Sequence, residues 1–113
     1  MRCNMTERRN NPRIPLEDIL YIHIASADRN LSSVLLDISV SGARLGLPPN
    51  EVLPPVGSEV VFTDTALLAP FLENRKATVL WGVGVQFGVC FTQQINARIE
   101  DIAELLRSEI FYS

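Results

Sequence analysis

Residues 34–47 read VLLDISVSGARLGL, and this stretch decides the fold interpretation. Apolar side chains occupy every second position of its first half, and a period of two is typical of a strand with one buried face. The pair Ser41-Gly42 interrupts the alternation, which then resumes over residues 43–47. A glycine at this point indicates a bend or bulge between two strands. The face predicted to be buried before the glycine carries Val34, Leu36, Ile38 and Val40.

The same alternation extends to both sides of this hairpin. Turn signals separate the strands at Asp28-Arg29-Asn30, in the proline-rich loop 48–57 and at Gly82-Val83-Gly84. Several short strands with such turns between them are typical of a small barrel or sandwich. The further strands are predicted over residues 14–25, 58–63, 77–81 and 85–91, with Ala77, Val79 and Trp81 sharing the buried face of the third.

The apolar spacing changes at the C-terminus. Ile95, Ile99, Ile102 and Leu106 recur at intervals of four, three and four residues, with charged residues between them. That spacing predicts an amphipathic helix of roughly 15 residues that packs on the barrel through its apolar stripe.

The segment 64–74 follows neither pattern. Leu67, Leu68, Phe71 and Leu72 have helical spacing, but Pro70 interrupts them. One interpretation is a segment that caps one end of the barrel. The other is an exposed apolar patch for a partner or a second copy.

Length and charge limit the functions that are open to the chain. Its 113 residues, 47% hydrophobic and 20% charged, predict one globular domain. Residues 1–13 carry a net charge of +3 and the other 100 residues a net charge of −6, so we divide the chain into a basic arm, 1–13, and a domain, 14–113. The acidic domain disfavours general binding of duplex DNA, which needs many phosphate contacts. We expect no membrane insertion. The charged start Thr6-Glu7-Arg8-Arg9 replaces the apolar core of a signal peptide and predicts a cytoplasmic protein.

The basic arm is the first candidate for a binding site. Pro12 disfavours the helical conformation of Asn11, so Arg9 and Arg13 can converge on one ligand while Arg8 reaches another side of it. Guanidinium groups bind phosphate, stack on aromatic rings and recognise the O6/N7 edge of guanine. The alternative, which the arm taken alone favours, is a solvated tail.

Asp37, Ser39 and Gly42 form the second candidate. The alternation places Asp37 and Ser39 opposite the predicted apolar face, so we expect both to project from the barrel wall toward solvent or ligand. A carboxylate there can accept the N–H donors of a guanine, a hydroxyl can bond base or phosphate, and a glycine permits close approach. The alternative is a strand end where both side chains bond local backbone groups.

Together the two segments resemble the PilZ domain family. The arginines stand as Arg-Arg-x-x-x-Arg and are followed by Asp-x-Ser-x-x-Gly. Ala77-x-Val79-x-Trp81 and Gly88-Val89-x-Phe91 agree with the family, and the resemblance covers about residues 7–107. It departs from the family pattern at residues 65–74, which look longer and more apolar than the usual strand connection.

The resemblance implies an all-β fold, a six-stranded antiparallel Greek-key barrel with a C-terminal amphipathic helix. It also implies binding of the bacterial second messenger cyclic di-GMP. Arg8, Arg9 and Arg13 would contact phosphates and guanines, Asp37 and Ser39 would contact a guanine, and Gly42 would keep the turn open.

The expected function is that of a stand-alone cyclic di-GMP receptor that engages an effector protein, and a homodimer stays open. The alternative is an adaptor of the same fold, related to pili or motility, that works without nucleotide. The chain shows no Cys–His pair, metal-ligand set, phosphate-binding glycine loop or paired buried acids, so we expect neither an enzyme nor a cofactor. A barrel for single-stranded nucleic acid would need stacking aromatics and a basic groove.

Overall fold

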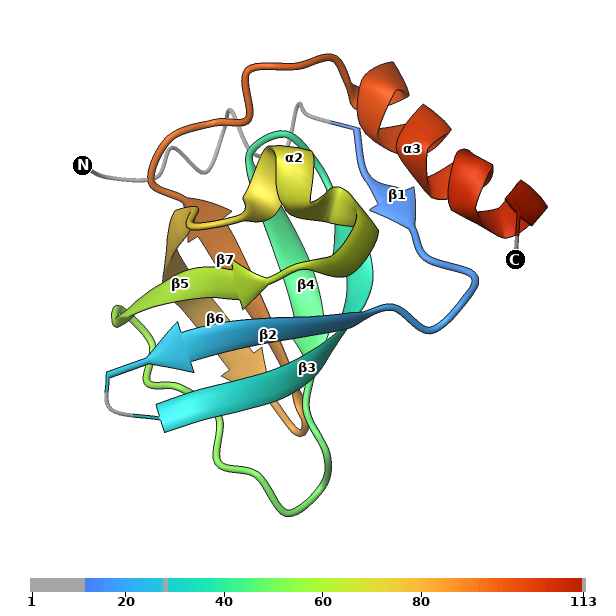
Figure 1. The fold of residues 1–113 in the computed structure, drawn as a ribbon. Helices are drawn as coiled ribbons and strands as arrows, with labels where there is room; N and C mark the ends of the chain where they lie inside the picture. The colour runs from blue at the N-terminus through green and yellow to red at the C-terminus, as the bar shows by residue number, and fades with distance from the viewer. Residues whose placement is uncertain (1–11, 28, 113) are drawn as a thin grey trace.

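The hairpin around Gly42 helps to close a β-barrel (Figure 1). The computed structural model describes residues 12–27 and 29–112. Its strands are β1 (Ile14–Pro15), β2 (Tyr21–Ser26), β3 (Arg29–Ile38), β4 (Gly42–Gly46), β5 (Glu59–Asp64), β6 (Lys76–Val83) and β7 (Gln86–Phe91). A 3₁₀ turn, η1 (Ala66–Leu68), and two helices, α2 (Ala69–Leu72) and α3 (Ile99–Tyr112), complete the elements.

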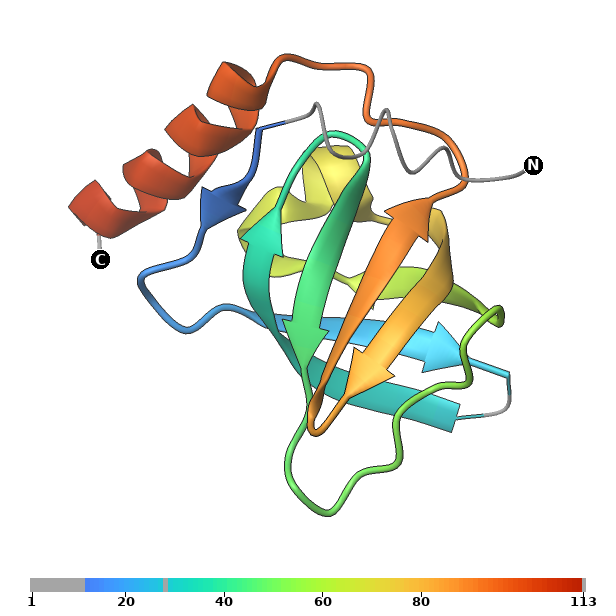
Figure 2. The ribbon, with the colours of Figure 1, turned by 180° about the vertical axis from the view of Figure 1, so that it is seen from behind.

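All strand pairs are antiparallel, in the order β1-β3-β2-β5-β6-β7-β4. An additional pairing of β3 with β4 closes β2–β7 into a ring of six strands. Among these six, only the connection from β4 to β5 joins strands that are not neighbours. Figure 2 shows β4, β7 and β6 side by side in the wall that faces the viewer. The predicted six-stranded antiparallel barrel with a C-terminal helix is therefore confirmed.

The predicted first strand is divided into two. β1 pairs with the end of β3, where Ile14 lies opposite Ile38, whereas Tyr21 in β2 lies opposite Val34. Residues 16–20 thus span only two residues of the partner strand. Leu16 and Leu20 still hydrogen-bond to β3, and residues 17–19 lie outside the ladder between them.

The predicted core face of β3 is wrong in its first half. Leu31 and Leu35 are buried, while Val34 and Leu36 are only half-buried. The register against β4 shifts between Leu35 and Asp37, so Leu36 is an extra residue. Such a bulge exchanges the two faces of the strand. Beyond it, Ile38 is fully buried, as the alternation predicted.

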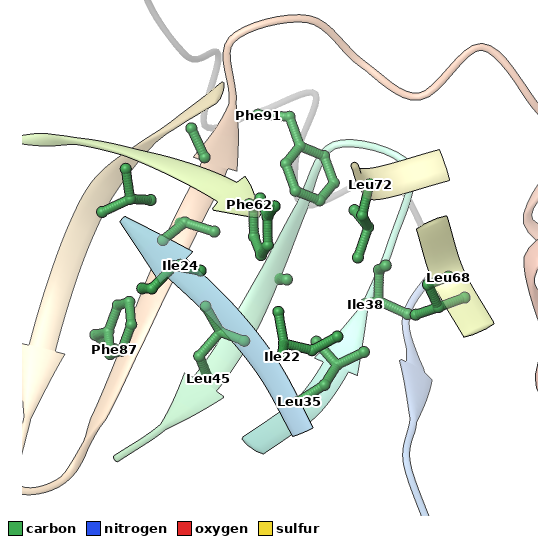
Figure 3. Close-up of a cluster of buried hydrophobic side chains, with 14 of the residues drawn as sticks. Ile22, Ile24, Leu35, Ile38, Leu45, Phe62, Leu68, Leu72, Phe87 and Phe91 are labelled. Carbon is green, nitrogen blue, oxygen red and sulfur yellow. The ribbon is translucent and has the colours of Figure 1, made fainter. Parts of the chain in front are cut away.

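The core fills the barrel and continues under α2 (Figure 3). Phe62 and Phe91 meet edge to face, with ring centroids 5.8 Å apart. Leu68 and Leu72 are completely buried, so the segment 64–74 caps one end of the barrel. This observation decides between the two interpretations of that segment. Side chains from every strand of the ring take part, including Ile22, Ile24, Leu35, Leu45, Phe62, Ala77 and Phe87.

The C-terminal helix packs beside the barrel through the predicted stripe. Ile102 is fully buried and Leu106 nearly so, and α3 contacts η1. α3 begins at Ile99, later than the predicted helix. Ile95 lies before it and is buried, and its N–H donates to the carbonyl of Val40 at 2.8 Å. Among the described residues, no helix is long and apolar enough to cross a bilayer.

The cap formed by α2 predicts a stability effect. Leu72→Ala should lower the free energy of unfolding by about 2–5 kcal/mol, because it leaves a cavity between α2 and the barrel. Urea unfolding followed by Trp81 fluorescence measures this difference. Val52→Ala is the control: Val52 is 70% exposed, so its truncation should change stability by less than about 0.5 kcal/mol. A Leu72→Ala protein as stable as the control would contradict a packed cap.

Candidate functional site

The turn between β3 and β4 is held together by Ser39. Its hydroxyl oxygen accepts hydrogen bonds from the backbone N–H groups of Ser41 and Gly42, both at 3.2 Å. The N–H of Ser39 also donates to the carbonyl of Gly42 at 2.8 Å. Ser39 is completely buried, so the expectation that it projects toward solvent is wrong. The structure instead shows the alternative interpretation for Ser39, a strand end whose side chain bonds local backbone groups.

Gly42 is required by close packing. A Cβ atom at this position would overlap the backbone carbonyl oxygen of Val89 in β7. Any other residue would therefore push β4 away from β7. Ser39 and Gly42 together fix the shape and register of this hairpin, which places Asp37 opposite Arg44.

The Asp37 carboxylate lies between two guanidinium groups. Nη1 of Arg13 donates to Oδ1 at 2.7 Å, and Nε of Arg44 lies 3.0 Å from Oδ2. Arg13 directly precedes β1, whereas Arg44 lies in the barrel wall on β4. The prediction had Asp37 project from the barrel wall toward solvent or ligand; the two arginines cover its side chain, which is only 13% exposed. The nearest charges are two cations and one anion, so the cluster carries a net positive charge.

The cluster belongs to a row of residues on the outer surface of the barrel. Asp37, Arg44, Gly88 and Trp81 are successive cross-strand partners on β3, β4, β7 and β6. The neighbouring row points into the core, and it consists of Ile38, Ala43, Val89 and Val79, all almost fully buried. Since adjacent rows face opposite sides of a sheet, the Asp37 row faces outward.

The prediction that Trp81 lies on the buried face of its strand is wrong. The register of β6 against β7 shifts between Val79 and Trp81, so Leu80 is an extra residue and Trp81 leaves the core face. Its indole lies over Gly88, where a Cβ atom would overlap the ring. Trp81 is half-buried on the outer surface. A flat aromatic ring therefore ends the row that begins at Asp37.

The predicted site residues are brought together in part. Arg13 and Asp37 touch, and Ser39 and Gly42 shape the adjoining turn. Arg8 and Arg9 lie outside the described residues. Sequence reasoning missed Arg44. The signal for it was available, because a hairpin turn over residues 39–42 pairs 38 with 43 and therefore 37 with 44.

The cluster combines groups that suit a guanine nucleotide. Arginine donors bind anionic oxygens such as those of phosphate, and a carboxylate accepts the N–H groups of a base. In the part of the chain that the structure describes, no group of three or more His, Cys, Asp and Glu side chains could hold a metal ion.

A separate groove is lined in part by β1. It has a volume of about 640 Å³ and lies between residues 14–20, η1 and α3. Leu16, Leu67 and Leu106 are among its lining residues, and none of the predicted site residues lines it.

Comparison with known proteins identifies the family of the chain. A family model described as PilZ domain matches residues 7–108. The match includes the arginine motif, the Asp37 hairpin, the barrel and most of α3. No curated protein matches the chain. Because the family model covers most of its length, the chain belongs to the PilZ domain family, a family of receptor domains that bind cyclic di-GMP.

Proposed function

We propose that this chain is a cyclic di-GMP receptor whose site is the outer face of the barrel around Asp37. The observation that carries the proposal is the 2.7 Å contact between Arg13 and Asp37. It brings the last arginine of the arm motif to the acidic residue of the hairpin motif. Arg13 and Asp37 lie 24 residues apart in sequence and are in direct contact.

The chemistry assigns different tasks to the two partners. A guanine base presents N–H donors on its Watson–Crick edge, and Asp37 can accept them through Oδ1, which has lone pairs beyond the one used by Arg13. Arg13, with Arg8 and Arg9, supplies donors for the two phosphates and the O6/N7 edges of the ligand. Ser39 and Gly42 contribute the shape of the turn, since Ser39 is buried and Gly42 packs on Val89.

The proposed output is engagement of an effector protein, as membership of the PilZ domain family implies. A cytoplasmic location fits a receptor for a nucleotide second messenger. The alternative is a nucleotide-independent adaptor of the same fold. A chain that is stably folded but does not bind cyclic di-GMP would be such an adaptor.

Cyclic di-GMP should bind and stabilise the fold. Free ligand at about 100 times its dissociation constant should add roughly 2.7 kcal/mol to the free energy of unfolding. Calorimetric titration and a thermal melt with saturating ligand measure the two effects. GTP and cyclic GMP are the controls, and they should bind more weakly because each offers one guanine. Flat titration heats together with an unmoved melting temperature would refute the receptor.

Arg13→Ala should weaken cyclic di-GMP binding by about 10- to 150-fold, because it removes a charge-assisted contact worth roughly 1.5–3 kcal/mol. Calorimetric titration measures the loss. The fold itself should lose only about 1 kcal/mol or less, because the ion pair is partly exposed and Asp37 keeps Arg44.

Arg98→Ala is the matched control for this variant. Arg98 is 77% exposed on the far end of the chain and pairs with Asp101, so its loss should leave affinity within about a factor of two. The double variant Arg9→Ala/Arg13→Ala should bind still more weakly than Arg13→Ala. If the double variant bound cyclic di-GMP as tightly as the wild type, the binding site would have to lie elsewhere on the protein.

A further inference from the structure

Arg44 occupies the centre of the outer row but belongs to neither sequence motif. Its side chain is 41% exposed, against 28% for Arg13. Nε faces Oδ2 of Asp37 at 3.0 Å, and Nη1 reaches the side-chain carbonyl of Gln86 at 3.5 Å. The guanidinium is thus tethered along one edge and only loosely held along the other.

The backbone fixes Arg44 independently of the N-terminal arm. β4 pairs with β3 on one side and with β7 on the other, and Arg44 is the central residue of its five. Its cross-strand neighbours are Asp37 and Gly88. A group held by two ladders in this way is preorganised for a ligand, and its ordering entropy does not oppose binding.

The Arg44 side chain is open to an anion from solution, because 41% of it is exposed. The next residue of the row, Gly88, has no side chain, and the indole of Trp81 fills the space over it. A guanidinium carries five N–H donors and no acceptor, and the Nη edge of Arg44 has only the long 3.5 Å contact with Gln86, so it retains donors for the oxygens of an anion. Asp37 neutralises one of the two arginine charges beside it, which leaves one positive charge for the ligand.

We propose that Arg44 binds a phosphate of the ligand through its Nη groups while its Nε edge stays on Asp37. This inference rests on the proposed cyclic di-GMP site and adds a contact to it. The paired side chains then bind the two halves of a guanine nucleotide. Asp37 binds the base, and Arg44 binds the phosphate. A base without phosphate would leave the Nη edge unused.

The test is calorimetric titration of the full chain with cyclic di-GMP at several salt concentrations. Arg44→Gln removes the charge and keeps a polar side chain beside Asp37 and Gln86. It should bind about tenfold more weakly or worse, with a shallower dependence of affinity on salt, because one arginine–phosphate pair is lost. Arg44→Lys should also bind more weakly, since an ammonium group cannot hold Asp37 and a phosphate together, but its salt dependence should match the wild type.

Arg29→Gln is the control with the same change of charge. Arg29 begins β3 and donates to the carbonyl of Val52 at 2.9 Å, far along the strand from Asp37. Its loss should leave affinity within about a factor of two. Thermal melts establish that each variant is folded at the temperature of titration. If Arg44→Gln is not folded at that temperature, the affinity of Arg44→Lys for cyclic di-GMP tests the proposal instead.

The outcomes separate this inference from the proposed function. A wild-type chain that gives no heat with cyclic di-GMP overturns both. A wild type that binds, with Arg44→Gln or Arg44→Lys binding equally well, overturns only the role of Arg44. An Arg44→Gln protein that binds weakly with unchanged salt dependence also overturns the phosphate contact, because the loss would then act through Asp37.

Discussion

A single carboxylate between two guanidinium groups organises the functional face of this barrel. Asp37 is only 13% exposed, and a charge so far removed from water requires partners. Arg13 supplies one from the segment before β1, and Arg44 supplies the other from β4. The arm motif, the hairpin motif and the barrel wall therefore meet at one residue. Removing both arginines would leave a mostly buried charge unpaired, which is costly.

The contact between Asp37 and Arg44 follows from the register of the hairpin. The buried hydroxyl of Ser39 closes the turn, and the missing side chain of Gly42 lets β4 approach β7. A slip of one residue would turn Asp37 toward the core and Ile38 toward solvent. Two bulges, at Leu36 and Leu80, bring Asp37 and Trp81 to the same outer row as Arg44. The row is a property of paired strands and not of any one segment.

Features that depend on one segment could be predicted from the sequence, whereas features that depend on paired strands could not. The alternation around Ser41-Gly42 and the spacing of Ile99, Ile102 and Leu106 are local, so they predicted the hairpin and the helix. The burial of the segment 64–74 depends on space at the end of the barrel, and the spacing of its leucines could not show that space. A bulge is defined by the opposite strand. For that reason the core face of β3 and the position of Trp81 were predicted wrongly. Ser39 bonds the backbone of its own turn, as the alternative interpretation of that segment proposed. Arg44 could have been found by counting outward from the turn.

The central claim is that cyclic di-GMP meets the protein at the Asp37 row. Two-dimensional NMR of the ¹⁵N-labelled chain during titration tests it directly, because arginine Nε–H groups and backbone amides report their own surroundings. Our account predicts that the largest shifts occur at the Nε–H signals of Arg13 and Arg44 and at the amides of Asp37 and Gly88. Shifts concentrated instead on α3 and the groove beside β1, with the Arg13 and Arg44 signals unmoved, would contradict it.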